Sequence, residues 1–218
     1  MHDLTAIDVL VDPDETTLRN AHTWNARMRE SVPDGFALDA SHRPHITTLQ
    51  RYVRTADLDD VCGAVHRTLA ATDTSALSYQ AFAIGHADWG VPGQGLAVIV
   101  LRPSPQVLAL QASLQAAISP STESGGTAAA FVTDPGEDIS QSTLDWVDDY
   151  VPAQIGPDRY TAHITVGFAT LDDLRTIEAE PFDPSPSARP ASPCTSSEAA
   201  EPPASFSEAG PQRTDLTS

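Results

Sequence analysis

The tripeptide His-Ile-Thr occurs twice in the chain, at residues 45–47 and at residues 163–165. On an extended strand, residues two apart point to the same face, so each histidine shares one surface with its threonine while the isoleucine turns to the core. An imidazole can accept or release a proton near neutral pH, and a hydroxyl group can donate a hydrogen bond to a phosphoryl oxygen. Two such strands facing each other would supply a general base, a general acid and two hydroxyl donors, which the opening of a cyclic phosphate ester requires.

A third stretch, His66-Arg67-Thr68, fits the looser pattern of a histidine two residues before a hydroxyl residue. Its surroundings carry apolar residues at steps of three and four, which predicts a helix, where positions two apart face roughly opposite sides of the axis. We therefore exclude this stretch on geometry. The two remaining matches share their central isoleucine, a strand-like context and a separation of 118 positions, which suits one contribution from each of two similar halves of the chain.

The pattern of apolar residues predicts the elements that must position these two strands. Strands are expected at residues 6–11, 44–53, 76–85, 95–101 and 161–168, and helices at residues 14–32, 56–71, 104–118, 140–150 and 171–180. The segment 119–138 is rich in Gly, Ser and Thr and is expected to be a loop. Strands and helices are interleaved with connections of varying kind, which favours an α+β fold over a regular parallel α/β sheet.

From residue 181 to residue 218 the composition changes to Pro, Ser and Ala with few large apolar groups. Such a segment buries too little surface to offset the entropy lost on ordering, so we expect a disordered tail after a domain formed by residues 1–180. Codons permitted for Ser185 to Glu198 also encode a strand-like sequence when they are read two bases later. We therefore hypothesise that a frameshift replaced a final strand with this tail.

The charge composition excludes several mechanisms. The chain of 218 residues has a formal net charge of −18, with 30 acidic residues, 12 arginines and no lysine. No lysine side chain is available for adenylylation by ATP, for a Schiff base with pyridoxal phosphate or for a Walker-type loop. The negative charge also repels the backbone of long nucleic acids, whose protein partners usually carry clustered cations. Long duplexes are therefore not expected as ligands, whereas a small anion in a local pocket is allowed.

The cysteines and the apolar runs bear on the cellular location of the protein. No basic segment precedes the first apolar stretch, and the longest apolar run, residues 96–101, is far too short to cross a membrane. Cys62 and Cys194 lie far apart and indicate neither a zinc site nor a disulfide framework. We therefore expect a cytoplasmic monomer with no membrane contact, no metal and no cofactor.

With its two His-Ile-Thr strands, the chain resembles the 2H phosphoesterase superfamily, also called the 2′-5′ RNA ligase-like or cyclic phosphodiesterase family. The signature of that family is one H-x-[ST]-hydrophobic strand in each of two lobes. The resemblance covers residues 4–180 and implies a bilobal α+β fold, with two antiparallel-rich sheets around a central groove and helices outside. In such a fold His45 and His163 would be catalytic, and Thr47 and Thr165 would bind the phosphate.

The same resemblance implies an activity and a substrate class. The expected reaction is metal-independent hydrolysis of 2′,3′-cyclic phosphates of nucleosides or RNA ends, and its reversal would be a 2′-5′ RNA ligase reaction. The substrate would be a small nucleotide or an RNA terminus. A different class of function also stays open, namely a non-catalytic member of the same fold that binds a nucleotide or a protein partner.

Other residues near the motifs have two interpretations each. Arg43 and Arg51 flank the first motif and are candidates for phosphate contacts, but an arginine beside a strand end is more often a solvated rim residue. Tyr160 precedes the second motif and is a candidate for stacking on a nucleobase or for packing in the core. The sequence does not assign the roles of base and acid to individual histidines.

Overall fold

The computed structural model describes residues 3–39, 42–133 and 138–182 of the chain. In chain order its main elements are β1 (Leu4–Val11), α1 (Glu15–Ser31), β2 (Ile46–Arg54), α2 (Leu58–Ala70), β3 (Tyr79–Ala87), β4 (Gln94–Pro103), α3 (Pro105–Ile118), α4 (Gln141–Gln154), β5 (His163–Thr170) and α5 (Leu171–Glu178). This order matches the predicted one, and the α+β class is confirmed. The predicted tail and its suspected frameshift lie, from residue 183 onward, outside the described residues.

Local signals explain where several helices begin and end. The Asp14 carboxylate caps α1 by accepting a hydrogen bond of 2.8 Å from the Thr17 backbone N–H. Helix α3 begins with Pro105, whose missing N–H costs nothing in the first turn. Helix α4 extends four residues beyond its predicted end and contains Pro152 in its last turn, where the missing N–H leaves the Asp148 carbonyl without its helical donor.

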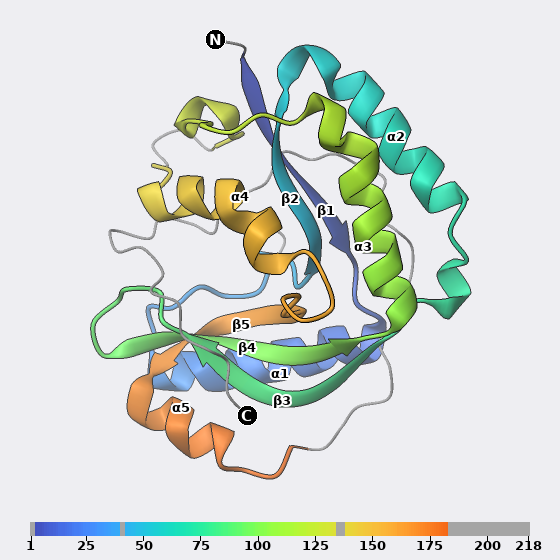
Figure 1. The fold of residues 1–218 in the computed structure, drawn as a ribbon. Coiled ribbons are helices and arrows are strands. Elements are labelled where there is room, and N and C mark those ends of the chain that lie inside the picture. The colour runs from blue at the N-terminus through green and yellow to red at the C-terminus, as the bar shows by residue number, and fades with distance from the viewer. Residues whose placement is uncertain (1–2, 40–41, 134–137, 183–218) are drawn as a thin grey trace.

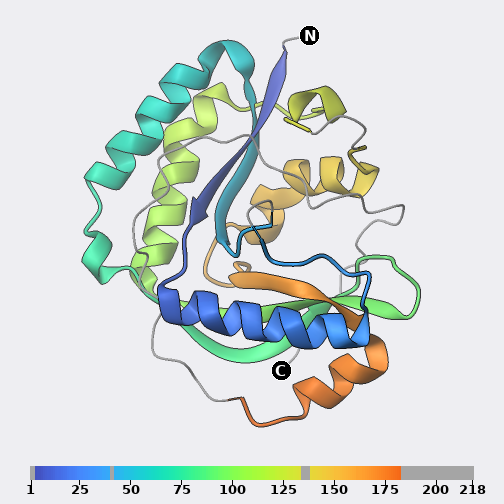
Figure 2. The ribbon, with the colours of Figure 1, turned by 180° about the vertical axis from the view of Figure 1, so that it is seen from behind.

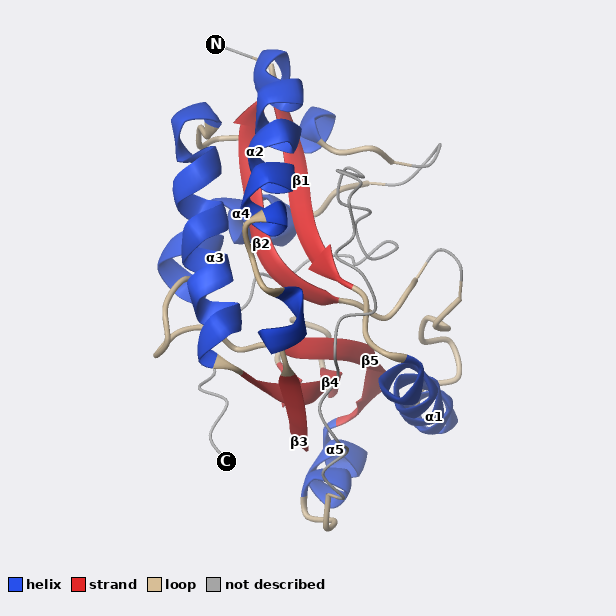
Figure 3. Ribbon diagram, turned by 90° about the vertical axis from the view of Figure 1, so that its right-hand side faces the viewer, coloured by secondary structure: helices blue, strands red, loops and turns tan. Residues whose placement is uncertain are grey.

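The five strands form two separate antiparallel sheets. Strands β1 and β2 make one sheet, and β3, β4 and β5 make the other in that order. Figure 3 shows that β1 and β2 run at a steep angle to the strands of the second sheet. The two His-Ile-Thr strands, β2 and β5, therefore belong to different sheets, and they contact each other where the sheets meet.

Each sheet is covered by its own helices. Helices α2 and α3 pack side by side next to the first sheet, and α4 packs against β2 (Figure 1). Helix α1 lies along β5, as the view from behind shows, and α5 contacts all three strands of the second sheet (Figure 2). In the part of the chain that the structure describes, no helix is both long enough and apolar enough to span a membrane.

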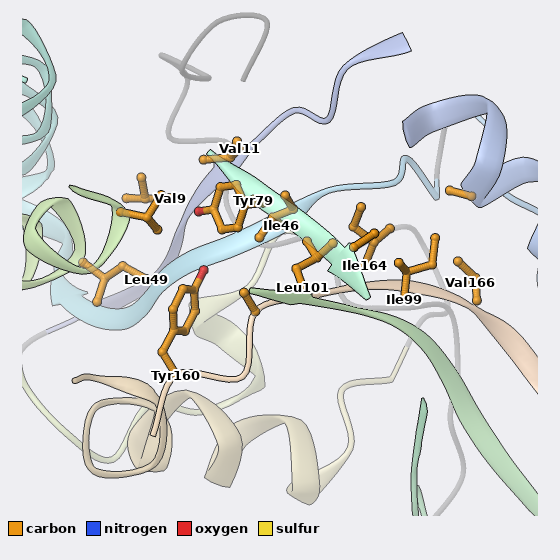
Figure 4. Close-up of a cluster of buried hydrophobic side chains, with 14 of the residues drawn as sticks. Val9, Val11, Ile46, Leu49, Tyr79, Ile99, Leu101, Tyr160, Ile164 and Val166 are labelled. Carbon is orange, nitrogen blue, oxygen red and sulfur yellow. The ribbon is translucent and has the colours of Figure 1, made fainter. Parts of the chain in front are cut away.

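The main hydrophobic core fills the space between the two sheets. It contains Ile46 and Ile164, the central residues of the two His-Ile-Thr stretches, and both are fully buried. Figure 4 shows these two side chains in one cluster with residues from β1, β3 and β4. Because successive strand residues alternate between faces, anchoring both isoleucines in this core turns the neighbouring histidines and threonines away from it.

Candidate active site

The structure brings the two predicted histidines to the junction of the sheets. His45 directly precedes β2, and His163 is the first residue of β5. In the strand registers, Thr47 lies opposite Leu10 of β1 and Thr165 lies opposite Val98 of β4. All four predicted site residues keep some exposure to solvent, unlike the isoleucines between them. The predicted division of each motif into a core residue and two outward residues is therefore confirmed.

Both imidazoles are held by the same local hydrogen bond. The Nδ1 atom of His45 lies 2.8 Å from the carbonyl oxygen of Arg43, and the Nδ1 atom of His163 lies 2.7 Å from that of Thr161. A carbonyl oxygen can only accept a hydrogen bond, so Nδ1 carries the proton and donates it in each ring. In the neutral ring, Nε2 is then the unprotonated nitrogen, and it can act as a base.

The two histidines also influence each other electrostatically. Desolvation by the surrounding protein lowers the pKa of both imidazoles below its usual value, although His45 itself stays exposed. The positive charge of His45 lowers the pKa of His163 further. The Arg43 carbonyl and the charge of Asp12 oppose the shift at His45. The rings are therefore near enough for a proton on one to disfavour a proton on the other.

A β-bulge follows the threonine in each motif. The register between β1 and β2 shifts between Val9 and Leu10, so that Thr48 is an extra residue, and the register between β4 and β5 shifts so that Val166 is extra. Thr48 and Leu49 are both fully buried, and so are Val166 and Gly167. The two strands thus share one plan, in which a histidine and a threonine face outward and two consecutive residues then turn inward.

Gly167 is required by this plan in β5. Its φ of 135° lies in a region that side chains rarely adopt, and an added Cβ would lie 3.0 Å from the Cβ of Met28 on α1. The neighbouring carbonyl of Val166 accepts a hydrogen bond of 3.0 Å from the Asn25 amide. The same amide group donates to Phe36, and the Asn25 oxygen accepts from the Leu38 backbone. Asn25 therefore joins the bulge of β5 to the segment that leads toward His45.

Tyrosine hydroxyl groups hold the bulge of β2. Tyr160 and Tyr150 both donate to the backbone carbonyl of Thr47, at 2.8 and 3.2 Å. The Tyr160 hydroxyl also hydrogen-bonds to that of Tyr79. Tyr160 is only 8% exposed, which contradicts a role in stacking on a nucleobase and supports the packing interpretation. It joins the segment before β5 to the first His-Ile-Thr strand.

Gln111 completes this buried polar group and could not be singled out from the sequence. It lies on α3 with no exposed surface, and its amide donates to the Thr48 carbonyl at 3.2 Å. Its oxygen accepts from the Gly156 backbone at 3.4 Å. A glutamine at a position that the apolar pattern assigns to the core is the one signal that the sequence offers for it.

The two arginines beside the first motif have different positions. Arg43 is exposed and lies 3.9 Å from Asp12, at the rim of the site, so a contact with substrate stays a prediction. Arg51 pairs with Ile7 in the register, on the core-facing side of the sheet with Leu49. Uninterrupted alternation would have placed Arg51 on the face of His45 and Thr47, but the bulge at Thr48 reverses the order. A phosphate contact by Arg51 stays a prediction.

Asp8 lies on the same sheet face as Thr47, one step further along the strands. It pairs with Gln50 in the register, next to the pair formed by Leu10 and Thr47. Burial raises the pKa of Asp8 to about 7, and a hydrogen bond with Gln50 opposes the shift. Its Oδ1 atom is buried and has no hydrogen-bond partner among the described residues. Its place as the one charged residue of the apolar stretch 6–11 is the signal that the sequence offers for it.

Within the described ranges, no three His, Cys, Asp or Glu side chains are grouped so that they could hold a metal ion. His66 and Thr68 lie in helix α2, which confirms that the third match to the motif is unrelated to the site. No protein-family model and no curated protein matches the chain.

Proposed function

We propose that the protein is a phosphoesterase that hydrolyses 2′,3′-cyclic phosphates of nucleosides or RNA ends, and that His45 and His163 carry out the proton transfers. One observation carries the proposal: two electrostatically coupled imidazoles, each fixed through Nδ1 to a backbone carbonyl, each two residues from an outward threonine. This arrangement, with one motif in each of two antiparallel sheets, resembles the two-histidine design of the 2H phosphoesterases.

The proposed reaction uses one neutral and one protonated imidazole. The neutral Nε2 removes a proton from water, and the water oxygen forms a bond to phosphorus. The bond from phosphorus to one ribose oxygen breaks on the opposite side, and the protonated imidazole gives its proton to that oxygen. The products are a ribose hydroxyl and a phosphomonoester, and the pair of histidines ends with its proton exchanged.

The coupling between the rings favours this mixed state of protonation. Because a charge on His45 lowers the pKa of His163, the pair passes through a range of pH in which it holds one proton. Burial lowers the pKa of both histidines, and the charges of Asp12 and Arg43 act on the pKa of His45 in opposite directions, so either imidazole can take the role of base. Thr47 and Thr165 would donate hydrogen bonds to the non-bridging oxygens as charge develops on them.

A non-catalytic protein that binds nucleotides is the second candidate function. Asp8, on the same sheet face as Thr47, favours this second function. Its pKa is raised and its Oδ1 has no hydrogen-bond partner among the described residues, yet the proposed hydrolysis gives it no role. In that function the histidines and threonines would bind phosphate without turnover.

Substitution of the histidines tests the proposal. His45→Ala and His163→Ala should each lower kcat for a nucleoside 2′,3′-cyclic phosphate in buffer with EDTA by about 10²-fold or more, as expected for the loss of a proton-transfer group. Phosphorus NMR would follow the opening of the ring. His66→Ala is the matched control, because His66 also precedes a threonine by two residues but lies on α2.

The outcomes separate the two candidate functions. Full turnover in either of the His45 or His163 variants would refute the mechanism. The non-catalytic function would be supported if the unmodified protein binds the nucleotide but does not hydrolyse it anywhere between about pH 5 and pH 8.

A further inference from the structure

An exposed aromatic ring and an arginine form a pair at the end of β4. Phe82 of β3 is 37% exposed, and the guanidinium carbon of Arg102 lies 5.0 Å from the centre of its ring. This distance is that of a cation–π contact, which holds a guanidinium group in place at an exposed site. The arrangement restricts a long side chain that would otherwise be mobile at the surface.

A third β-bulge turns Phe82 outward. The register between β3 and β4 shifts between Ala81 and Ala83, so that Phe82 is the extra residue of the bulged strand. Ala81 is buried in the main core opposite Leu101, whereas Phe82 is not. The bulge therefore removes a large apolar side chain from the core and presents it on the surface.

The strand register places this pair on the same sheet face as the second candidate catalytic histidine. His163 lies opposite Val100 in the ladder between β4 and β5, and Arg102 follows Val100 by two residues. Residues two apart on a strand share a face and are about 6.8 Å apart. Arg102 is thus a diagonal neighbour of His163 across the two strands, at roughly 7–8 Å, a length comparable to the span of one nucleotide.

The Arg102 guanidinium is available to an external anion. Among the described residues no carboxylate or carbonyl group engages it, and its one contact is with the Phe82 ring. Several other arginines pair with carboxylates of the fold, as when Arg175 pairs with Asp172 at 2.8 Å and Arg54 pairs with Asp57. A stacked guanidinium uses only its flat face, so its N–H groups stay free for the oxygens of a phosphate.

We propose that Arg102, held by Phe82, binds the phosphodiester that lies one nucleotide before the reacting cyclic phosphate. The preferred substrate is then the 3′ end of a single-stranded RNA, and a free cyclic mononucleotide is a poorer one. This inference rests on the proposed function, because the reacting phosphate must lie at His163. It also fits a protein of net charge −18, in which a cation placed beside the reacting site can select a short anionic terminus without attracting a long backbone.

Two substrates separate this subsite from the reaction itself. One is a nucleoside 2′,3′-cyclic phosphate, and the other is a dinucleotide that carries the same terminal nucleotide and one upstream phosphodiester. The unmodified protein should have the higher kcat/KM on the dinucleotide. Arg102→Gln should raise KM for the dinucleotide about 5- to 10-fold, the loss expected for one charge-assisted contact, and should leave the kinetics of the mononucleotide unchanged. Phe82→Leu should act in the same direction with a smaller effect.

Arg67→Gln is the matched control, since Arg67 is exposed on α2 and the substitution changes the net charge equally. Equal effects of Arg102→Gln on both substrates, or no effect on either, would overturn the subsite while leaving hydrolysis intact. Absence of turnover of both substrates by the unmodified protein would overturn the proposed function. In that case titration calorimetry with a dinucleoside 3′-phosphate tests the Arg102 subsite separately. The affinity for this ligand should fall in the Arg102→Gln variant, and an unchanged affinity would refute the subsite.

Discussion

Asp8 is a carboxylic acid whose ionisation the fold opposes. Its pKa is raised to about 7 because burial disfavours the charged form, so at intermediate pH the folded state holds a proton that the unfolded chain has lost. Stability from this group is therefore present below the ordinary pKa of about 4 and is lost as the pH rises toward 7. A shift of about three units corresponds to at most about 4 kcal/mol, and partial exposure of the residue reduces this to about 2 kcal/mol.

Asp8→Asn removes the ionisation and should change how stability depends on pH. Relative to the unmodified protein, the variant should gain about 2 kcal/mol in the free energy of unfolding between about pH 5 and pH 8. Urea unfolding at the two pH values measures this difference. Asp158→Asn, at an exposed loop position, should give the same relative stability at both. If the free energy of unfolding of Asp8→Asn differs from that of the unmodified protein by the same amount at both pH values, the Asp8 carboxyl group is ionised in the folded protein.

At the scale of the strands, the β-bulges set the limit of what the sequence could predict. Alternation from His45 and His163 correctly placed each threonine and each buried isoleucine, because these residues lie within two positions of one another. Beyond Thr47 the alternation fails, since one extra residue in β2 reverses the faces and moves Arg51 to the core side. Gly167 marks the second bulge in the sequence, but Thr48 carries no such signal.

The tertiary contacts of Tyr160 could not be predicted from the sequence either. Its partner, the carbonyl of Thr47, lies 113 positions earlier in the chain and becomes its neighbour only when β2 and the segment before β5 are brought together. A tyrosine next to a motif indicates proximity in sequence, whereas its burial and its hydroxyl partner decide its role. The element order, in contrast, depends on local periodicity and was predicted correctly.

Tyr160→Phe tests whether this connection between the strands positions the site. The ring still packs, but Thr47 loses its shorter hydrogen bond, so we expect kcat to fall about 3- to 10-fold with KM and the pH profile unchanged. Stability should fall by about 1 kcal/mol. Tyr79→Phe is the control, because it removes the hydrogen bonds of the Tyr79 hydroxyl to Tyr160 and Thr48 and leaves the Thr47 carbonyl its donors. An equal loss of kcat in both variants would mean that the bond to Thr47 does not position the site.

The charge of the whole molecule determines how much nucleic acid it can bind. Residues 1–180 carry a net charge of −15, and several of their arginines pair with the protein's own carboxylates, such as Arg27 with Glu180. Binding to a duplex gains its free energy from the counterions released when free cations neutralise phosphates. A molecule with few free cations and a large negative charge lacks this contribution, so the proposed RNA substrate would be bound through its end and not along its length.

A duplex RNA of about 20 base pairs with ordinary ends should therefore neither bind nor inhibit, even at low ionic strength where attraction to a basic protein would be strongest. Fluorescence anisotropy of the labelled duplex at low salt should show no saturation, whereas a single-stranded oligonucleotide with a terminal 2′,3′-cyclic phosphate should compete with the mononucleotide for hydrolysis. A duplex that binds tightly, and releases steeply as salt is added, would reveal a cationic surface that the net charge conceals. Because repulsion weakens as salt screens it, any residual binding should instead strengthen slightly with ionic strength.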